Sequence, residues 1–263
     1  MPIRKKETSA LLSSLLAFSI GTLAQDVIPR GTILPIRFDS SLSLKTTPGR
    51  TIKGRIMQDV PVSAQTRIRE GAKVFGHVIR VVHADARGYS EISFQFDQLV
   101  FSGHTIPITT ALRAMASFVE VEDAQVPLTG PDRGTPSSAW TTTQIGGDTV
   151  YRGGGPVVAG SSIVGQPTYN GVLGRIYSVP GSECADADDN ENGPQALWVF
   201  SANACGTYGF ANVGITRSGR SAPLGEITLA STGGKLTVPS GSGMLLRIIN
   251  SGNEKTYSGG HAE

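Results

Sequence analysis

The residue types best suited to chemistry lie in the acidic segment ECADADDNENG, residues 183–193. Its alternating acidic and amide side chains end at Gly193, as in the first half of a calcium-binding loop, where alternate oxygen ligands and a glycine turn surround a hard cation. The candidate ligands are Asp186, Asp188, Asn190 and Asn192. Val199 stands where such a loop carries its glutamate, so calcium is a candidate cofactor and a solvated acidic turn is the alternative.

Four aromatic residues follow this segment in two pairs, and the members of each pair are two positions apart: Trp198, Phe200, Tyr208 and Phe210. Residues two apart in a strand point to the same face of a sheet. This spacing predicts a candidate aromatic surface on which a sugar would stack. The alternative is that the rings fill a core or an interface, where aromatic residues contribute large buried areas.

The sequence offers no recognisable catalytic constellation, and we predict that the protein is not an enzyme. It contains four histidines, His77, His83, His104 and His261. None lies in a His-Glu-x-x-His zinc motif, and there is no Gly-x-Ser-x-Gly nucleophile elbow. His77 and His83 are too far apart in one strand to share a metal ion. We therefore assign no catalytic residue.

The two cysteines, Cys184 and Cys205, are predicted to form a disulfide bond because the chain carries an export signal. Basic residues precede a short apolar run that ends at Ala24, which is typical of a signal peptide over residues 1–24 with Gln25 as the first mature residue. An uncleaved anchor is the alternative. We expect a periplasmic, outer-membrane-associated or secreted protein with no transmembrane helix after cleavage.

Composition argues against a nucleic-acid binder and favours β-structure. Without residues 1–24 the chain is close to neutral, whereas nucleic-acid binders carry an excess of Lys and Arg. The chain has 33 glycines and no long helical periodicity, which favours short strands joined by turns. We predict an all-β (mainly β) fold: a distorted β-barrel or sandwich with a Gly/Pro-rich excursion and a disulfide-tied insertion.

Individual elements can be placed with the same patterns. The clearest alternation occurs in SEISFQF, where one face carries Ile92, Phe94 and Phe96. Turn residues after this strand predict a hairpin over residues 91–108, and a Gly-Gly turn predicts a second hairpin over residues 225–238. Residues 111–125 carry apolar side chains at helical spacing and are the helix candidate, with an extended strand as the alternative.

One phrase occurs at both ends of the chain, as VIPRGTILPIRF in residues 27–38 and TVPSGSGMLLRI in residues 237–248. A looser copy, RIREGAKVFGHV, begins at residue 67. The turns of the three copies are predicted at Gly31, Gly71 and Gly241, each followed by a new strand. We expect the terminal copies to pair and close one β-domain, which removes free edges, with residues 139–220 inserted. The alternative is a common turn without shared meaning.

The predicted organisation follows from these signals. It comprises a signal peptide (1–24), the first part of the barrel domain (25–126), a Gly/Pro/Ser/Thr-rich excursion (127–167), a disulfide-containing β insertion (168–220), C-terminal strands that close the domain (221–250) and a polar tail (251–263). If the two ends instead formed separate domains, the boundary would fall in residues 127–167.

The order of turns and strands resembles the C-terminal β-domain of the TrbI-type conjugal-transfer family, which are envelope proteins of type IV secretion systems. The matching features are Gly31-Thr32, Pro48-Gly49, Asp59-Val60, Gly71 and Gly76, together with the closing phrase LTVPSGSGMLLRI. The resemblance implies a β-barrel that acts without catalysis, through assembly with envelope proteins or with copies of itself. The alternative function is a secreted β-rich module that binds calcium, a glycan or another cell-wall ligand; the sequence identifies no small-molecule ligand.

Overall fold

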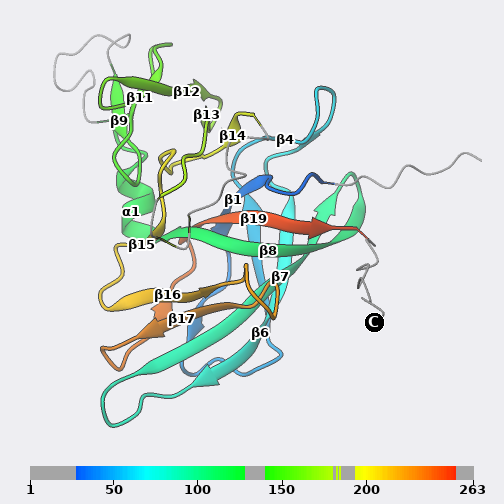
Figure 1. Ribbon diagram of the computed structural model, residues 1–263, viewed down its shortest axis with the longest axis vertical. Helices are drawn as coiled ribbons and strands as arrows, with labels where there is room; N and C mark the ends of the chain where they lie inside the picture. The colour runs from blue at the N-terminus through cyan, green and yellow to red at the C-terminus, as the bar shows by residue number, and fades with distance from the viewer. Residues whose placement is uncertain (1–27, 128–139, 180–181, 183, 185–192, 253–263) are drawn as a thin grey trace, which may run out of the picture.

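The computed structural model describes residues 28–127, 140–179, 182, 184 and 193–252. Strands dominate these residues, and their helical content is one short helix, α1 (Phe118–Asp123). The strands form a nine-stranded sheet that closes into a barrel, a second six-stranded sheet and two short ribbons (Figure 1). The prediction of a mainly β fold with a barrel is confirmed.

Six antiparallel strands form the closed barrel. They are β1 (Ile33–Phe38), β3 (Thr51–Ile56), β6 (Lys73–Val82), β7 (Ser90–Phe101), β8 (His104–Ala116) and β19 (Gly243–Ser251). Their order is β8-β19-β1-β3-β6-β7, and the ring closes because β7 also pairs with β8. Closure gives every strand of this ring a partner on both sides, which removes unpaired edges.

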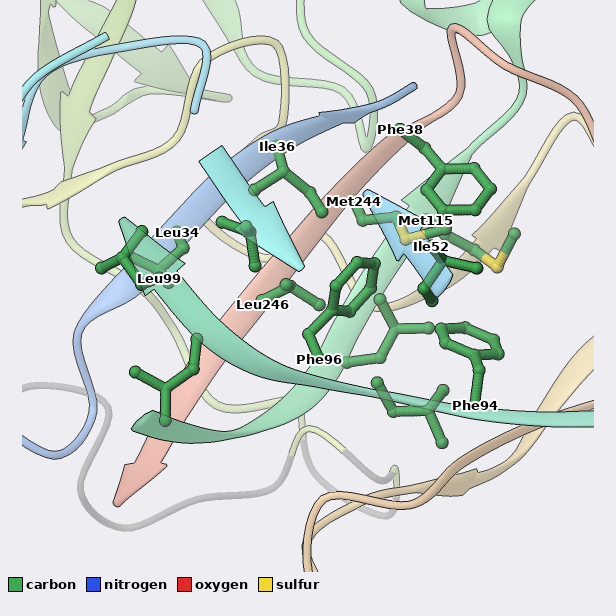
Figure 2. Close-up of a cluster of buried hydrophobic side chains, with 14 of the residues drawn as sticks. Leu34, Ile36, Phe38, Ile52, Phe94, Phe96, Leu99, Met115, Met244 and Leu246 are labelled. Atoms are coloured by element: carbon green, nitrogen blue, oxygen red, sulfur yellow. The ribbon is translucent and has the colours of Figure 1, made fainter. Parts of the chain in front are cut away.

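Alternating apolar side chains fill the inside of the barrel. Strand β3, for example, alternates exposed and buried residues along its whole length. Figure 2 shows aromatic and aliphatic side chains from different strands converging between them. The ring of Phe96 packs edge-on against Phe94 and Phe38, with centroid distances of 5.9 and 6.3 Å, a geometry that aromatic pairs favour. The barrel interior is therefore a packed core. Full burial of one phenylalanine side chain stabilises the folded state by roughly 1.5–3 kcal/mol relative to leaving it exposed.

The repeated phrase builds the turns that precede β1 and β19. Gly31 and Gly241 have φ angles of 87° and 93°, which favour glycine. The Gly31 N–H donates to the Ile248 carbonyl of β19 at 2.8 Å, and the Gly241 N–H donates to the Phe38 carbonyl of β1 at 2.7 Å. Because β1 and β19 are antiparallel, each turn satisfies a carbonyl of the other strand. The prediction that the two ends of the chain pair side by side is confirmed.

The looser copy performs the same task for β3 and β6. Gly71, with φ of 83°, donates its N–H to the Ile56 carbonyl at the end of β3 at 2.8 Å. Gly49, with φ of 81°, donates to the Val78 carbonyl of β6 at 2.7 Å. The same reciprocal turns therefore serve two strand pairs of the barrel, which explains why the phrase recurs.

Part of the chain between β8 and β19, from β9 to β14, forms a second antiparallel sheet. In spatial order its strands are β14 (Gln195–Ala196), β13 (Gly171–Gly174), β12 (Ser162–Thr168), β11 (Val157–Ala159), β10 (Thr149–Tyr151) and β9 (Thr141–Thr143). Its buried valines share a second core with Ile33 of β1 and Leu245 of β19. The next residue of each strand, Leu34 or Leu246, belongs to the barrel core instead. The second sheet thus packs on the outer face of the barrel wall, on the same side as α1 (Figure 1).

The remaining strands extend or brace the barrel. They are β15 (Gly206–Tyr208), parallel to β8; β17 (Ile227–Ser231), beside β7; β16 (Val213–Ser218), beside β17; the ribbon of β2 (Leu42–Ser43) with β18 (Thr237–Val238); and the β4 (Val60–Pro61) and β5 (Arg67–Ile68) hairpin. No helix in the described part of the chain has the length and apolar character needed to cross a membrane.

Local predictions had different outcomes. The hairpin over residues 91–108 is confirmed by the β7–β8 pairing. The predicted hairpin over residues 225–238 is wrong, because β17 pairs with β7 and β16 whereas β18 pairs with β2. The helix candidate over residues 111–125 is a strand up to Ala116, and the helix begins at Phe118, where the Ser117 hydroxyl accepts the Glu120 N–H. The described part of the Gly/Pro-rich excursion contains β9 to β12.

Candidate functional site

The predicted calcium ligands Asp186, Asp188, Asn190 and Asn192 lie outside the described residues. Within the described ranges, no group of three or more His, Cys, Asp or Glu side chains is placed to hold a metal ion. His77 lies in β6, and its Nδ1 is 2.9 Å from Asp97 of β7 on the barrel surface.

The predicted disulfide bond is present between Cys184 and Cys205. It joins the segment before β14 to the start of β15, and its Cα atoms are 6.0 Å apart. Because β15 pairs with β8, the bond attaches the end of the inserted segment to the barrel wall.

The four aromatic residues do not form the predicted stacking surface. Trp198 and Phe200 are buried in the second core, and Trp198 lies in a turn with a φ of 51° rather than in a strand. Tyr208 packs against the second core and Phe210 against the barrel core. The aromatic-surface interpretation is therefore wrong for Trp198 and Phe200: their apolar area is used to attach the second sheet to the barrel.

Two surface hollows lie where the barrel meets the second sheet, and we regard this seam as the candidate functional site. The first, called the hairpin cleft, has a volume of about 490 Å³ and opens between the β4–β5 hairpin and the turn that joins β12 to β13. Its lining includes Gln58, Asp59, Pro61, Arg67, Thr168 and Tyr169. Tyr169 is 86% exposed, an unusual state for a large aromatic side chain.

Charges on one wall of the hairpin cleft are held in place. Asp59 accepts the Glu70 N–H and an Arg69 Nη1–H, both at 2.9 Å, and Arg67 lies 3.7 Å away. Burial by itself raises the pKa of Asp59, but the Glu70 N–H and the two arginines lower it, and together they hold the pKa below its ordinary value. The Asp59 carboxylate is therefore ionised and fixed, and it holds Arg67 and Arg69 beside the cleft.

The second hollow, called the arginine hollow, has a volume of about 360 Å³. Its lining includes Met57, Glu70, Gln125, Arg152, Asn170 and Trp198. Glu70 lines both hollows, and its carboxylate accepts a hydrogen bond from the Asn170 amide at 2.7 Å. The two hollows thus lie on either side of one contact between the barrel and the second sheet.

Gln58 fixes the geometry of this seam. Its side chain is 1% exposed and lies just beyond the end of β3. The Gln58 Oε1 accepts the Trp198 N–H at 2.7 Å and the Val172 N–H at 3.2 Å, and its Nε2 donates to the Val172 carbonyl at 2.8 Å. One buried amide therefore satisfies backbone groups of two segments of the second sheet and attaches them to the barrel.

A second link comes from the arginine of the repeated phrase. Arg37 of β1 donates from Nη2 to Glu122 of α1 at 2.5 Å, and its guanidinium carbon lies 5.7 Å from the centre of the Trp198 ring. This contact places a cation over an indole face, which is favourable. Arg37 therefore connects β1, α1 and the turn after β14.

Sequence reasoning did not identify Gln58, Arg152 or Tyr169. Each is an isolated polar or aromatic residue with no partner at a diagnostic spacing, and they meet only because the second sheet folds back onto the barrel. The signal that was available is the glutamine between the alternating β3 strand and the Asp59-Val60 pair.

The candidate site combines parts of the barrel and of the second sheet. Its main features are a solid barrel, a second sheet held by Gln58, and two hollows at the seam between them. The resemblance to the TrbI-type family stays a prediction. No protein-family model matches this sequence, and no curated protein matches it either.

Proposed function

We propose that the protein is an exported, non-enzymatic envelope protein that acts through protein–protein assembly. Side chains fill the barrel, so a partner would meet its outer surface. The disulfide bond between Cys184 and Cys205 supports an oxidising compartment, where such bonds persist.

The observation that carries the proposal is the exposed Tyr169 of the hairpin cleft, which Arg67 also lines. Tyrosine and arginine are the residue types most enriched, with tryptophan, among the side chains that dominate binding energy at protein interfaces. Arg67 is 56% exposed in its side chain and lies 3.7 Å from the Asp59 carboxylate, so its charge is available to a partner. The expected partner is an envelope protein or a second copy of this chain.

The test measures the native mass of the chain extracted gently from its own cell envelope. We expect a defined complex larger than a monomer. The double variant Tyr169→Ala/Arg67→Ala should weaken it, because each side chain is expected to contribute more than about 1 kcal/mol to the interface. Tyr151→Ala is the matched control, since Tyr151 is 39% exposed on another part of the second sheet. A monomeric wild type would refute assembly, and a complex that survives the double variant would refute this contact surface.

The alternative function is a secreted β-rich binding module. The arginine hollow favours it, because this hollow combines apolar walls with polar groups, as small-molecule sites do. A calcium-dependent form of this function depends on residues 186–192, which lie outside the described part of the chain.

A further inference from the structure

The guanidinium of Arg152 is partly buried and faces a hollow at the seam. Arg152 follows β10, is half-buried, and lines the arginine hollow. Its Nε donates to the buried Thr142 hydroxyl at 3.0 Å. Among the described residues, no carboxylate lies within ion-pair distance of Arg152. By contrast, the more exposed Arg55, Arg69 and Arg80 each have an acidic partner.

An unpaired cation in a partly desolvated position costs free energy. Burial lowers the pKa of Arg152, which reflects the poorer solvation of its charged form. Arginine stays charged in proteins even so, and a desolvated charge is normally compensated by an opposite charge. The hollow in front of Arg152 has space for a ligand that supplies this charge.

The walls of the hollow define the rest of such a ligand. Met57 provides partly exposed apolar surface, the buried Trp198 and Val199 contribute only their edges, and the amide side chains of Gln125 and Asn170 complete the lining. A volume of about 360 Å³ accommodates a compact organic molecule rather than a folded partner. We propose that the arginine hollow binds a small organic anion that presents one carboxylate to Arg152 and an apolar body to Met57.

A carboxylate fits the site better than a phosphate. The planar guanidinium fork matches a carboxylate with two parallel hydrogen bonds. Glu70 lines the same hollow and adds a negative charge, which disfavours a dianion more than a monoanion. A single arginine also supplies one positive charge, enough to balance one carboxylate.

The test uses the full oxidised chain and the probes 3-phenylpropionate and hexanoate, each beside its neutral amide. The chain has two tryptophans, so a Trp140→Phe background makes the fluorescence of Trp198 report on the hollow. We expect at least one carboxylate to change this fluorescence saturably and to bind about tenfold or more tightly than its amide. At ten times its Kd it should raise Tm by about 3–6 °C.

Substitutions separate the site from general charge effects. Arg152→Gln should abolish the preference for the carboxylate over the amide, and Arg152→Lys should retain part of it, because lysine keeps the charge and loses the planar fork. Arg87→Gln, which removes an exposed arginine in another loop, should bind like wild type. If Arg152→Gln does not fold, a wild-type affinity for Arg152→Lys alone would overturn the proposal.

Three other results would also overturn it: neither carboxylate binds, each amide binds as well as its acid, or Arg152→Gln keeps the wild-type preference. This inference does not depend on assembly through the hairpin cleft. The Tyr169→Ala/Arg67→Ala variant should keep carboxylate binding, since neither residue lines the arginine hollow.

Discussion

Replacing Gln58 with leucine should detach the second sheet from the barrel. The substitution keeps a similar volume and removes the amide that accepts the Trp198 and Val172 N–H groups. The Val172 carbonyl keeps its bond from the Leu197 N–H at 2.9 Å, so two buried donors are left without partners. Each orphaned buried group costs about 1–3 kcal/mol, which gives a loss of about 2–5 kcal/mol after the small gain from burying leucine.

Hydrogen exchange measured residue by residue is the appropriate assay. The amides of Val172 and Trp198 should exchange at least about 30-fold faster in Gln58→Leu, because each 1.4 kcal/mol of local stability corresponds to about a factor of ten. The amide of Ile36, in the barrel core, should change much less. Gln65→Leu is the matched control, since Gln65 is exposed in the β4–β5 loop. Unchanged protection of Val172 and Trp198 would show that Gln58 does not hold the seam.

Burial raises the pKa of the Asp148 carboxyl, and the hydrogen bond that it accepts from a backbone N–H only partly offsets the increase. The folded state therefore binds the proton more tightly than the unfolded state. The free energy of unfolding of wild type should therefore rise relative to that of Asp148→Asn as the pH falls from 7 through the raised pKa. Urea titrations at several pH values measure this difference, and a difference that does not change with pH would contradict the prediction. Gly76→Ala should lower the free energy of unfolding by about 3 kcal/mol or more, because the added Cβ would lie 1.8 Å from a backbone oxygen of β7. Gly214→Ala is the control: its added Cβ meets open space, so the same titration should show a change of less than about 1 kcal/mol. Cys184→Ser/Cys205→Ser should lose about 3 kcal/mol in the chain-entropy account of disulfides, and equal urea midpoints would contradict it.

Much of the barrel could be predicted because its signals are local. The alternation at Ile92, Phe94 and Phe96 identifies a strand with one buried face, and the glycines of the repeated phrase require turns. The disulfide followed from two cysteines and an expected oxidising compartment.

Other elements depend on contacts that no local pattern contains. The end of β8 is buried on both faces, by the barrel core and by the second core, so its continuous apolar run cannot be distinguished from a helix by periodicity. The Gly233-Gly234 turn specified a reversal but not the partners of β17 and β18. Gln58 and Arg152 are far apart in the sequence, and only the packing of two sheets brings them to one seam.

The position of β19 has a consequence for how the protein folds. This strand is the last of the chain's described elements, and it lies between β1 and β8. At its end, the Ser251 hydroxyl accepts the Ile28 N–H and donates to the Ile28 carbonyl. The ring therefore cannot close until the final residues of the domain have been synthesised. Folding must wait for the pairing of β19 with β1, the most sequence-distant strand pairing among the described residues. This places the chain among slow, high-contact-order folders that complete on a timescale of roughly milliseconds to seconds. Until that moment β1 and β8 both present open edges, and the growing chain needs protection from association at these strands.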